Sequence, residues 1–152
     1  MSGQRRAWKK LREELIAAGG EEFAAKARTV SCVDRAEQIA AELSSGVPMG
    51  LLHGDLIPLN VMRSSAGALK MIDPDPFVGP LGFDLGFWCV RAGLQGEVLD
   101  LVDVAADAAD VDATELLVWA RTNAVMYGVY CVAFGRSVPE AVLNLAAGIK
   151  DV

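Results

Sequence analysis

The change in hydrophobic spacing between residues 48 and 80 constrains the fold of this chain more than any other feature. On both sides of this stretch, apolar residues recur every three to four positions, which is typical of amphipathic helices. Within it, residues 59–62 and 69–72 have the composition of short strands, and a turn at residues 64–67 separates them. The sequence therefore predicts a mainly α domain with a small β-hairpin (an α+β fold).

Helical spacing occurs in two blocks that flank this hairpin. The predicted helices cover residues 5–18, 21–28, 34–43, 83–94, a segment from residue 98, a long segment ending at residue 134, and a last one ending near residue 149. Asp112 with Glu115, and Ser137 with Glu140, have the spacing of capping boxes at the starts of the last two helices. Residues 74–80 are rich in proline and glycine, so they are expected to form an extended, irregular loop.

Length and charge limit the classes of function. A chain of 152 residues fits a single domain, 1–152, that can bury a sizeable core. The chain has 20 acidic and 14 basic residues, a net charge of −6, which argues against nucleic acid as a partner. The negative charge suits a small cationic molecule better.

The cysteines and the longest apolar run bear on the compartment. Cys32, Cys89 and Cys131 are far apart and lie among apolar residues, as expected for free buried thiols in a reducing compartment. The apolar run at residues 116–134 is interrupted by the polar triplet 121–123. A charge at that position is costly in lipid, so we expect a buried core helix and no membrane partner. Together with the free buried thiols, this predicts a cytoplasmic protein.

One polar constellation lies in and around the hairpin. His53, Asp55 and Asn60 precede or enter its first strand, and Asp73 directly follows its second strand. The hairpin return brings Asp73 to the same edge as Asp55 and Asn60. Two carboxylates and an amide oxygen at one rim suit Mg²⁺, and a carboxylate free of the metal can orient a hydroxyl and accept its proton. These are the main requirements of phosphoryl transfer.

The segment "LHGDLIPLN" at residues 52–60 resembles the HxDxxxxN motif of aminoglycoside phosphotransferases and related kinases. The following "LKMIDPDPFVGPLGFDLGFW" is similar to the streptomycin 6-kinase and hydroxyurea phosphotransferase branch of that family. The resemblance covers residues 48–92. It implies the C-terminal lobe of a protein-kinase-like fold, with opening helices at 1–46 and C-terminal helices at 96–149.

The resemblance also implies roles for individual residues. Asp55 matches the catalytic carboxylate that orients the acceptor hydroxyl and helps to remove its proton. Asn60 and Asp73 match the metal ligands, with Mg²⁺ as cofactor and ATP as co-substrate. His53 matches a residue that braces the catalytic loop, and Asp84 matches a helix-start aspartate that hydrogen-bonds to the backbone of that loop.

Three positions depart from the family pattern. Ile57 replaces a residue that is usually polar, and Leu59 replaces a small one where the backbone often turns tightly. Asp75 stands where the branch often has lysine; it is either a solvated loop carboxylate or a residue that supports the metal ligands from outside. The proposed catalytic and metal residues are all retained.

A nucleotide-binding lobe is not apparent, since nothing before Leu51 has the pattern of a five-stranded sheet. The chain is therefore expected to be a C-lobe without its N-terminal nucleotide lobe, which would leave an apolar cleft exposed and favour self-association. The first hypothesis is an ATP-dependent phosphotransferase acting on a small-molecule hydroxyl. The alternative is a catalytically inactive kinase-like remnant or binding module. A metal hydrolase using His53, Asp55 and Asp73 explains the sequence less well, because Asn60 and Asp84 would have no role.

Other noticeable residues are given structural interpretations. An acidic row on one helix is expected to be a solvated face, and it comprises Asp100, Asp103, Asp107 and Asp110. Four aromatic residues at helical spacing are expected to belong to the core, namely Trp88, Trp119, Tyr127 and Tyr130.

Overall fold

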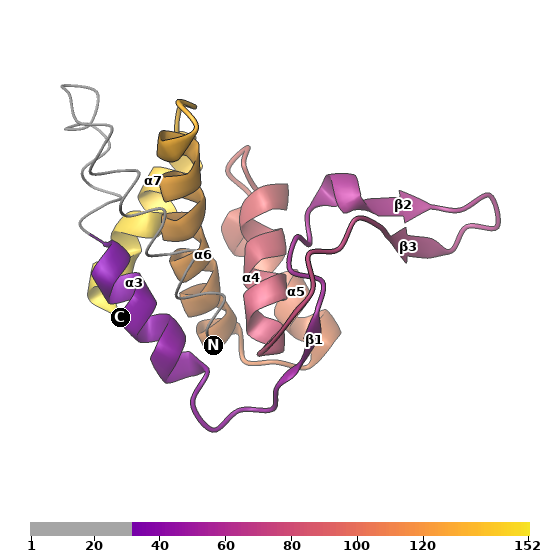
Figure 1. Cartoon of the computed structure of the whole chain (residues 1–152), viewed down its shortest axis with the longest axis horizontal. Coiled ribbons are helices and arrows are strands. Elements are labelled where there is room, and N and C mark those ends of the chain that lie inside the picture. Colours follow the sequence, from indigo (N-terminus) through magenta and orange to yellow (C-terminus); the bar gives the residue numbers. More distant parts are fainter. Residues whose placement is uncertain (1–31) are drawn as a thin grey trace.

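The computed structural model describes residues 32–152, so the helices expected at residues 5–18 and 21–28 lie outside the described part. Within it, the prediction of a mainly helical fold with small antiparallel sheets is confirmed (Figure 1). The elements, in order, are α3 (Val33–Leu43), β1 (Gly50–Leu52), η1 (Pro58–Asn60), β2 (Val61–Arg63), β3 (Leu69–Met71), β4 (Phe77–Gly79), α4 (Leu81–Ala92), α5 (Val98–Ala109), α6 (Ala113–Ala133), α7 (Glu140–Ala147) and η2 (Gly148–Asp151).

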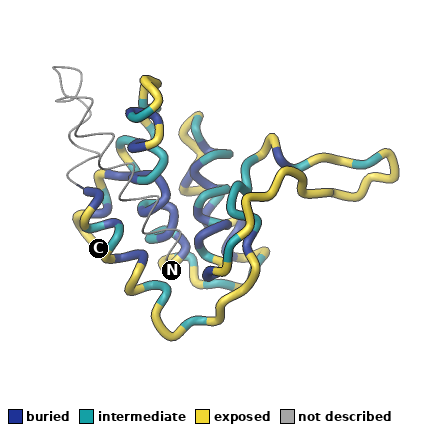
Figure 2. The backbone as a smooth tube through the Cα atoms, in the orientation of Figure 1, coloured by how far each residue is buried: buried dark blue, intermediate teal, exposed yellow. Residues whose placement is uncertain are grey.

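Helix α6 is the centre of the core. It packs against α3, α4, α5 and α7, and most of its length is buried (Figure 2). By length and composition α6 could cross a membrane, but its packing on four neighbouring helices is that of the core helix expected from the sequence. The polar side chain of Asn123 is fully buried within α6, and its Nδ2 donates to the Phe83 carbonyl of α4 at 3.0 Å. This bond ties the two helices together at the core.

Helix α4 lies very close to α6 because glycines face the contact. A Cβ at Gly86 would stand 2.9 Å from the backbone of Trp119 and Ala120, so the helices could not approach this closely with any side chain there. Beside this contact, the Phe83 ring meets the buried Trp119 ring edge to face at 6.1 Å between centroids.

The predicted hairpin is present as β2 and β3. Its antiparallel register pairs Val61 with Met71 and Arg63 with Leu69. The first strand starts later than predicted because residues 58–60 form a 3₁₀ turn. Figure 1 shows the hairpin projecting from the helical body, and large apolar side chains on and beside it are exposed, among them Leu59, Met62, Leu69 and Met71.

A second small sheet was not predicted. β1 and β4 pair antiparallel, with Gly50 opposite Gly79 and Leu52 opposite Phe77. The prediction that residues 74–80 are irregular throughout was therefore wrong, since residues 77–79 form β4. Each strand has three residues, and prolines and glycines surround them, so local composition could not reveal a pairing between segments far apart in sequence. This pairing brings together the two ends of the segment that carries the hairpin.

Several helix ends differ from expectation. α4 begins at Leu81 rather than residue 83. The cap of α6 forms, since Asp112 accepts a hydrogen bond from the Glu115 N–H at 2.7 Å. The Ser137 cap does not form, because α7 begins at Glu140, too far along the chain for Ser137 to be its N-cap residue. Pro139 occupies the N-cap position instead and makes no side-chain hydrogen bond.

Replacing Gly86 with alanine is expected to lower the free energy of unfolding. The added methyl would press against backbone that cannot yield, at a cost of about 1–3 kcal/mol that outweighs the gain in helix propensity. Urea unfolding followed by circular dichroism measures the effect. Gly50→Ala is the control, because a Cβ at Gly50 meets nothing within 4 Å. Equal stability of the two variants would show that the α4–α6 contact is not tightly packed.

Candidate active site

The loop that carries His53 and Asp55 is fixed to the start of α4. The Asp84 side chain is only 4% exposed and lies in the first turn of that helix. Its carboxylate accepts the His53 N–H at 2.6 Å and the Gly54 N–H at 3.1 Å. A buried carboxylate is costly unless its oxygens are paired, and here both oxygens take a backbone N–H near a helix N-terminus.

The return segment after β3 crosses this loop at van der Waals distance. Gly54 has φ +80°, and a Cβ there would stand 1.8 Å from the Asp75 carbonyl oxygen. Only glycine fits this crossing. The Asp75 N–H donates to the His53 carbonyl at 2.9 Å, and His53 Nε2 lies 3.0 Å from the Ile72 carbonyl oxygen. The His53 side chain thus bridges the two segments, and its buried Nδ1 has no hydrogen-bond partner.

Asp55 and Asn60 are in direct contact. Asn60 is 8% exposed, and its Nδ2 donates to both Asp55 Oδ2 and the Asp55 carbonyl, each at 2.9 Å. These bonds hold the Asp55 carboxylate in one orientation. Since both hydrogens of the amide face Asp55, the Asn60 Oδ1 atom is the part of the side chain left to accept or coordinate.

Asp73 reaches the same rim through the backbone. The Ile72 N–H donates to the Asn60 carbonyl at 2.9 Å, so Asp73 directly follows a residue bonded to Asn60. Asp73 has φ +55°, which is rare for a residue with a side chain although aspartate tolerates it better than most. The side chains of Asp73 and Asp75 are both exposed. Conformations of this kind concentrate at binding and catalytic sites.

The donor atoms at this rim fit a hard divalent cation. Asn60 Oδ1 and the Asp73 carboxylate are oxygen donors of the kind that Mg²⁺ takes, alongside water and phosphate oxygens. In residues 32–152 no three His, Cys, Asp or Glu side chains form a group that could hold a metal ion. This gives no support to the hydrolase interpretation, in which His53, Asp55 and Asp73 would share a metal.

The two departures in the loop do not distort it. Leu59 lies in the 3₁₀ turn with negative φ, and its side chain is 81% exposed, so the expected crowding of the backbone does not occur. Ile57 is half-buried and lines a cavity beside the loop.

That cavity has a volume of about 420 Å³ and lies between the loop, α4 and the C-terminal part of α6. Its lining residues are Asp55, Ile57, Phe87, Arg91, Met126, Tyr127, Tyr130 and Arg136. Cavities of this size commonly hold small-molecule ligands. Because Asp55 is part of the wall, a ligand in the cavity would meet the carboxylate directly.

Of the four aromatic residues expected in the core, Trp119 is buried, and the half-buried Trp88 and Tyr127 pack against the buried core. Tyr130 was wrongly expected to belong to the core, since it is 36% exposed. Helical spacing identifies a face of a helix without showing whether another element covers it. A signal was nevertheless present, since Arg91 is a basic residue among the apolar residues that end α4.

Arginine and tyrosine side chains stack along the cavity wall. The Arg91 guanidinium lies 4.3 Å from the centroid of the Tyr127 ring, and that of Arg136 lies 5.5 Å from the Tyr130 ring. The two tyrosine rings stack on each other with centroids 6.2 Å apart. Burial raises the pKa of the Tyr127 phenol, although Arg91 opposes the shift, so the phenol is neutral and serves as a hydrogen-bonding group.

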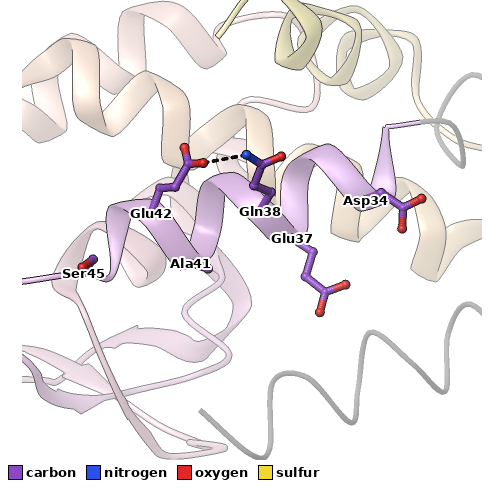
Figure 3. A pocket seen from close by; sticks show the side chains of 6 residues that line it. All are labelled: Asp34, Glu37, Gln38, Ala41, Glu42 and Ser45. Atoms are coloured by element: carbon purple, nitrogen blue, oxygen red, sulfur yellow. Dashed lines mark hydrogen bonds between the residues drawn. The ribbon is translucent and has the colours of Figure 1, made fainter.

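A second hollow, along α3, contains none of the predicted site residues (Figure 3). It is lined mainly by acidic and amide side chains, and Gln38 Nε2 donates to Glu42 Oε1 at 2.7 Å. The acidic row on α5 is exposed along its whole length, as predicted.

Cys32, Cys89 and Cys131 are buried thiols, as predicted. Burial raises the pKa of the Cys89 thiol to about 11 and raises that of Cys131 as well. Because a thiol is nucleophilic only when it is deprotonated, Cys89 and Cys131 are packing residues.

Comparison with known proteins gives one match. A family model described as aminoglycoside/hydroxyurea antibiotic resistance kinase matches residues 9–135. This span is most of the chain and includes the loop, the hairpin and helices α4–α6. No curated protein and no solved structure matches the chain.

Replacing Asp84 with asparagine should loosen the loop that carries His53 and Asp55. The amide would present an NH₂ group to one of two backbone N–H donors, which leaves a buried donor unpaired at a cost of about 1–3 kcal/mol. Hydrogen exchange should show faster exchange of the His53 and Gly54 amides, and urea unfolding a lower stability. The exposed Asp103→Asn on α5 serves as control. If exchange at these amides is unchanged in the Asp84 variant, the carboxylate does not fix the loop.

Proposed function

The chain belongs to the aminoglycoside/hydroxyurea antibiotic resistance kinase family, and we propose that its loop and hairpin form the catalytic centre of an ATP-dependent phosphotransferase. The acceptor is a hydroxyl group of a small molecule bound in the cavity beside Asp55. One observation carries this proposal: the Asp55 carboxylate, oriented by Asn60, lies in the wall of that cavity.

Asp55 has the position needed to assist the attacking hydroxyl. A hydroxyl bound in the cavity can donate its hydrogen to the carboxylate, which directs an oxygen lone pair toward the phosphate. As the bond from this oxygen to the γ-phosphorus forms and the bond to the ADP oxygen breaks, Asp55 accepts the proton. Asn60 keeps the carboxylate in place, and Asp84 and His53 fix the loop that carries it.

Asn60 and Asp73 are the residues that would hold Mg²⁺. When bound there, the ion would neutralise negative charge on the phosphates of ATP. The nearby Asp75 adds a second exposed carboxylate that can hydrogen-bond a metal-bound water. The chain itself holds the oxygen donors of Asn60 and Asp73 on adjacent backbone segments. The hydrogen bond from the Ile72 N–H to the Asn60 carbonyl joins these segments.

We further propose that the described residues correspond to the C-terminal lobe of a kinase-like fold and act in the cytoplasm, where MgATP is abundant and thiols stay reduced. In residues 32–152 the strands form two sheets of two strands each, so no larger nucleotide-covering sheet belongs to this part of the chain. The alternative function, a binding module without turnover, shares the acceptor cavity and differs only in lacking phosphate transfer.

The Asp55→Asn variant tests the catalytic role. Phosphate transfer from labelled ATP to streptomycin or hydroxyurea is measured with the protein and any segment encoded in frame upstream. Loss of the proton-accepting carboxylate should reduce turnover by about 100-fold or more. Asp107→Asn on the exposed face of α5 should retain full activity. Transfer at the unaltered rate by Asp55→Asn would remove Asp55 from the mechanism.

The 152-residue chain alone is expected to bind MgATP weakly. A rim with a metal site but little to hold the adenine should give a dissociation constant of roughly 1 mM or above, about −4 kcal/mol. Calorimetric titration should show that Asp73→Asn weakens this binding further, whereas Asp107→Asn leaves it unchanged. A dissociation constant in the low micromolar range would mean that this chain builds a complete nucleotide site.

A further inference from the structure

We propose that Ile57 determines the acceptor specificity of this site: together with aromatic side chains of α4 and α6, it selects a molecule with a saturated ring whose apolar face packs against it. This inference rests on the proposed function, since it takes the cavity beside Asp55 to be the acceptor site. It goes further because it names a residue that selects the acceptor and the shape of the acceptor next to its reacting hydroxyl.

Ile57 lies beside the proposed catalytic carboxylate on the same segment of the loop. It follows Asp55 by two residues, and both side chains line the cavity. The backbone of Ile57 is extended, with φ −125° and ψ 158°, as expected for a residue that precedes a proline. Its β-branched side chain has little rotational freedom. The loop wall next to Asp55 is therefore a hydrocarbon surface in a fixed place.

Helix α4 contributes an aromatic ring that the core holds in position. Phe87 lines the cavity and stacks on Phe83, with 6.4 Å between the ring centroids. The Phe83 ring is buried and in turn packs edge to face against the buried Trp119 ring. This wall of the cavity is therefore backed by the tightly packed contact between α4 and α6.

Helix α6 contributes two further rings that are held by their neighbours. Tyr127 and Tyr130 line the cavity and stack on each other at an angle of 15° between their planes. The Arg91 guanidinium lies over the Tyr127 ring, and side-chain hydrogen bonds link the Tyr127 hydroxyl to Arg91 and Cys131. Walls that are ordered before a ligand arrives lose little entropy when it binds.

A saturated ring with equatorial hydroxyls matches this arrangement. Both of its faces carry only C–H bonds, whereas its hydroxyls project from the rim, close to the mean plane of the ring. Between the loop and the helices, such a ring can place one face on Ile57, the other on the aromatic side chains, and a rim hydroxyl at Asp55. A polar group pressed against Ile57 would lose its hydrogen bonds to water without gaining others there.

The size of the cavity agrees with an acceptor of this shape. A volume of about 420 Å³ holds a six-membered ring with its substituents. Of the two acceptor types in the family description, aminoglycosides contain such rings and hydroxyurea does not. Ile57 therefore favours the aminoglycoside type, through the ring faces of the acceptor.

A matched set of three probes tests the preference for an apolar ring face. The probes are scyllo-inositol, myo-inositol and D-chiro-inositol, which are uncharged isomers with the same ring. Scyllo-inositol has no axial hydroxyl, myo-inositol has one, and D-chiro-inositol has one on each face. Ligand-observed NMR titration of the 152-residue chain measures each dissociation constant. Scyllo-inositol should bind roughly tenfold more tightly than D-chiro-inositol, with myo-inositol between them.

Two substitutions of Ile57 localise the effect. The side chains in Ile57→Val and Ile57→Thr are both β-branched and of the same shape, so the two variants differ in polarity alone. Ile57→Val should keep the preference for scyllo-inositol. Ile57→Thr should lower that preference roughly tenfold, because its hydroxyl can pair with an axial hydroxyl of the probe. Leu59→Thr, at an exposed position of the same loop, should leave all three dissociation constants unchanged.

A third substitution keeps the test valid if Ile57→Thr does not fold. Ile57→Ala removes most of the hydrocarbon surface without adding a polar group. It should weaken the binding of scyllo-inositol roughly tenfold and change that of D-chiro-inositol much less. Equal weakening of both probes would mean that residue 57 does not contact the ring face.

The outcomes separate this inference from the proposed function. Equal affinities for scyllo-inositol and D-chiro-inositol, no binding at millimolar concentration, or an unchanged preference in Ile57→Thr would overturn the inference, even if phosphate transfer to streptomycin were observed. A preference that depends on residue 57 would support it, even if the Asp55 assay showed no transfer. In that case the cavity would be a binding site for saturated rings, and the phosphotransferase proposal alone would fail.

Discussion

The candidate site depends on one buried carboxylate. Asp84 accepts the N–H groups of His53 and Gly54, and in this way joins the loop that carries Asp55 to the start of α4. α4 is itself joined to α6 by the Asn123 amide on the Phe83 carbonyl. Because Phe83 and Asp84 are adjacent, the two polar contacts transmit the rigidity of the core directly to the loop. An apolar residue at position 84 could pack equally well but could not satisfy those N–H groups.

Backbone contacts assemble the rest of the rim together with the side chains of His53 and Asn60. Gly54 lets the Asp75 carbonyl cross at a distance that any Cβ would forbid, and the Ile72 N–H bonds to the Asn60 carbonyl. Side chains such as Leu59 point outward and take no part. The outward position of Leu59 explains why this unusual residue leaves the loop geometry undisturbed.

The sequence predicted the parts of this structure that have a local cause. The period of apolar residues located α3 to α6, and the two runs around a turn located the hairpin β2–β3. The β1–β4 pair could not be predicted, because three-residue strands contain too few residues for a pattern and their pairing spans Leu52 to Phe77. The cavity was missed for a related reason: Arg91, Tyr127 and Arg136 come together through the α4–α6 packing, and no motif links them.

The acidic row on α5 contributes to the net charge of the chain but does not line the cavity. Its carboxylates are exposed, so water and salt screen them beyond about 10 Å. The field inside the cavity is set mainly by the side chains that line it, which among residues 32–152 include Asp55, Arg91 and Arg136. An acceptor bound there would therefore be oriented toward Asp55 by the cavity wall, and the net charge of the chain would have little influence on that orientation.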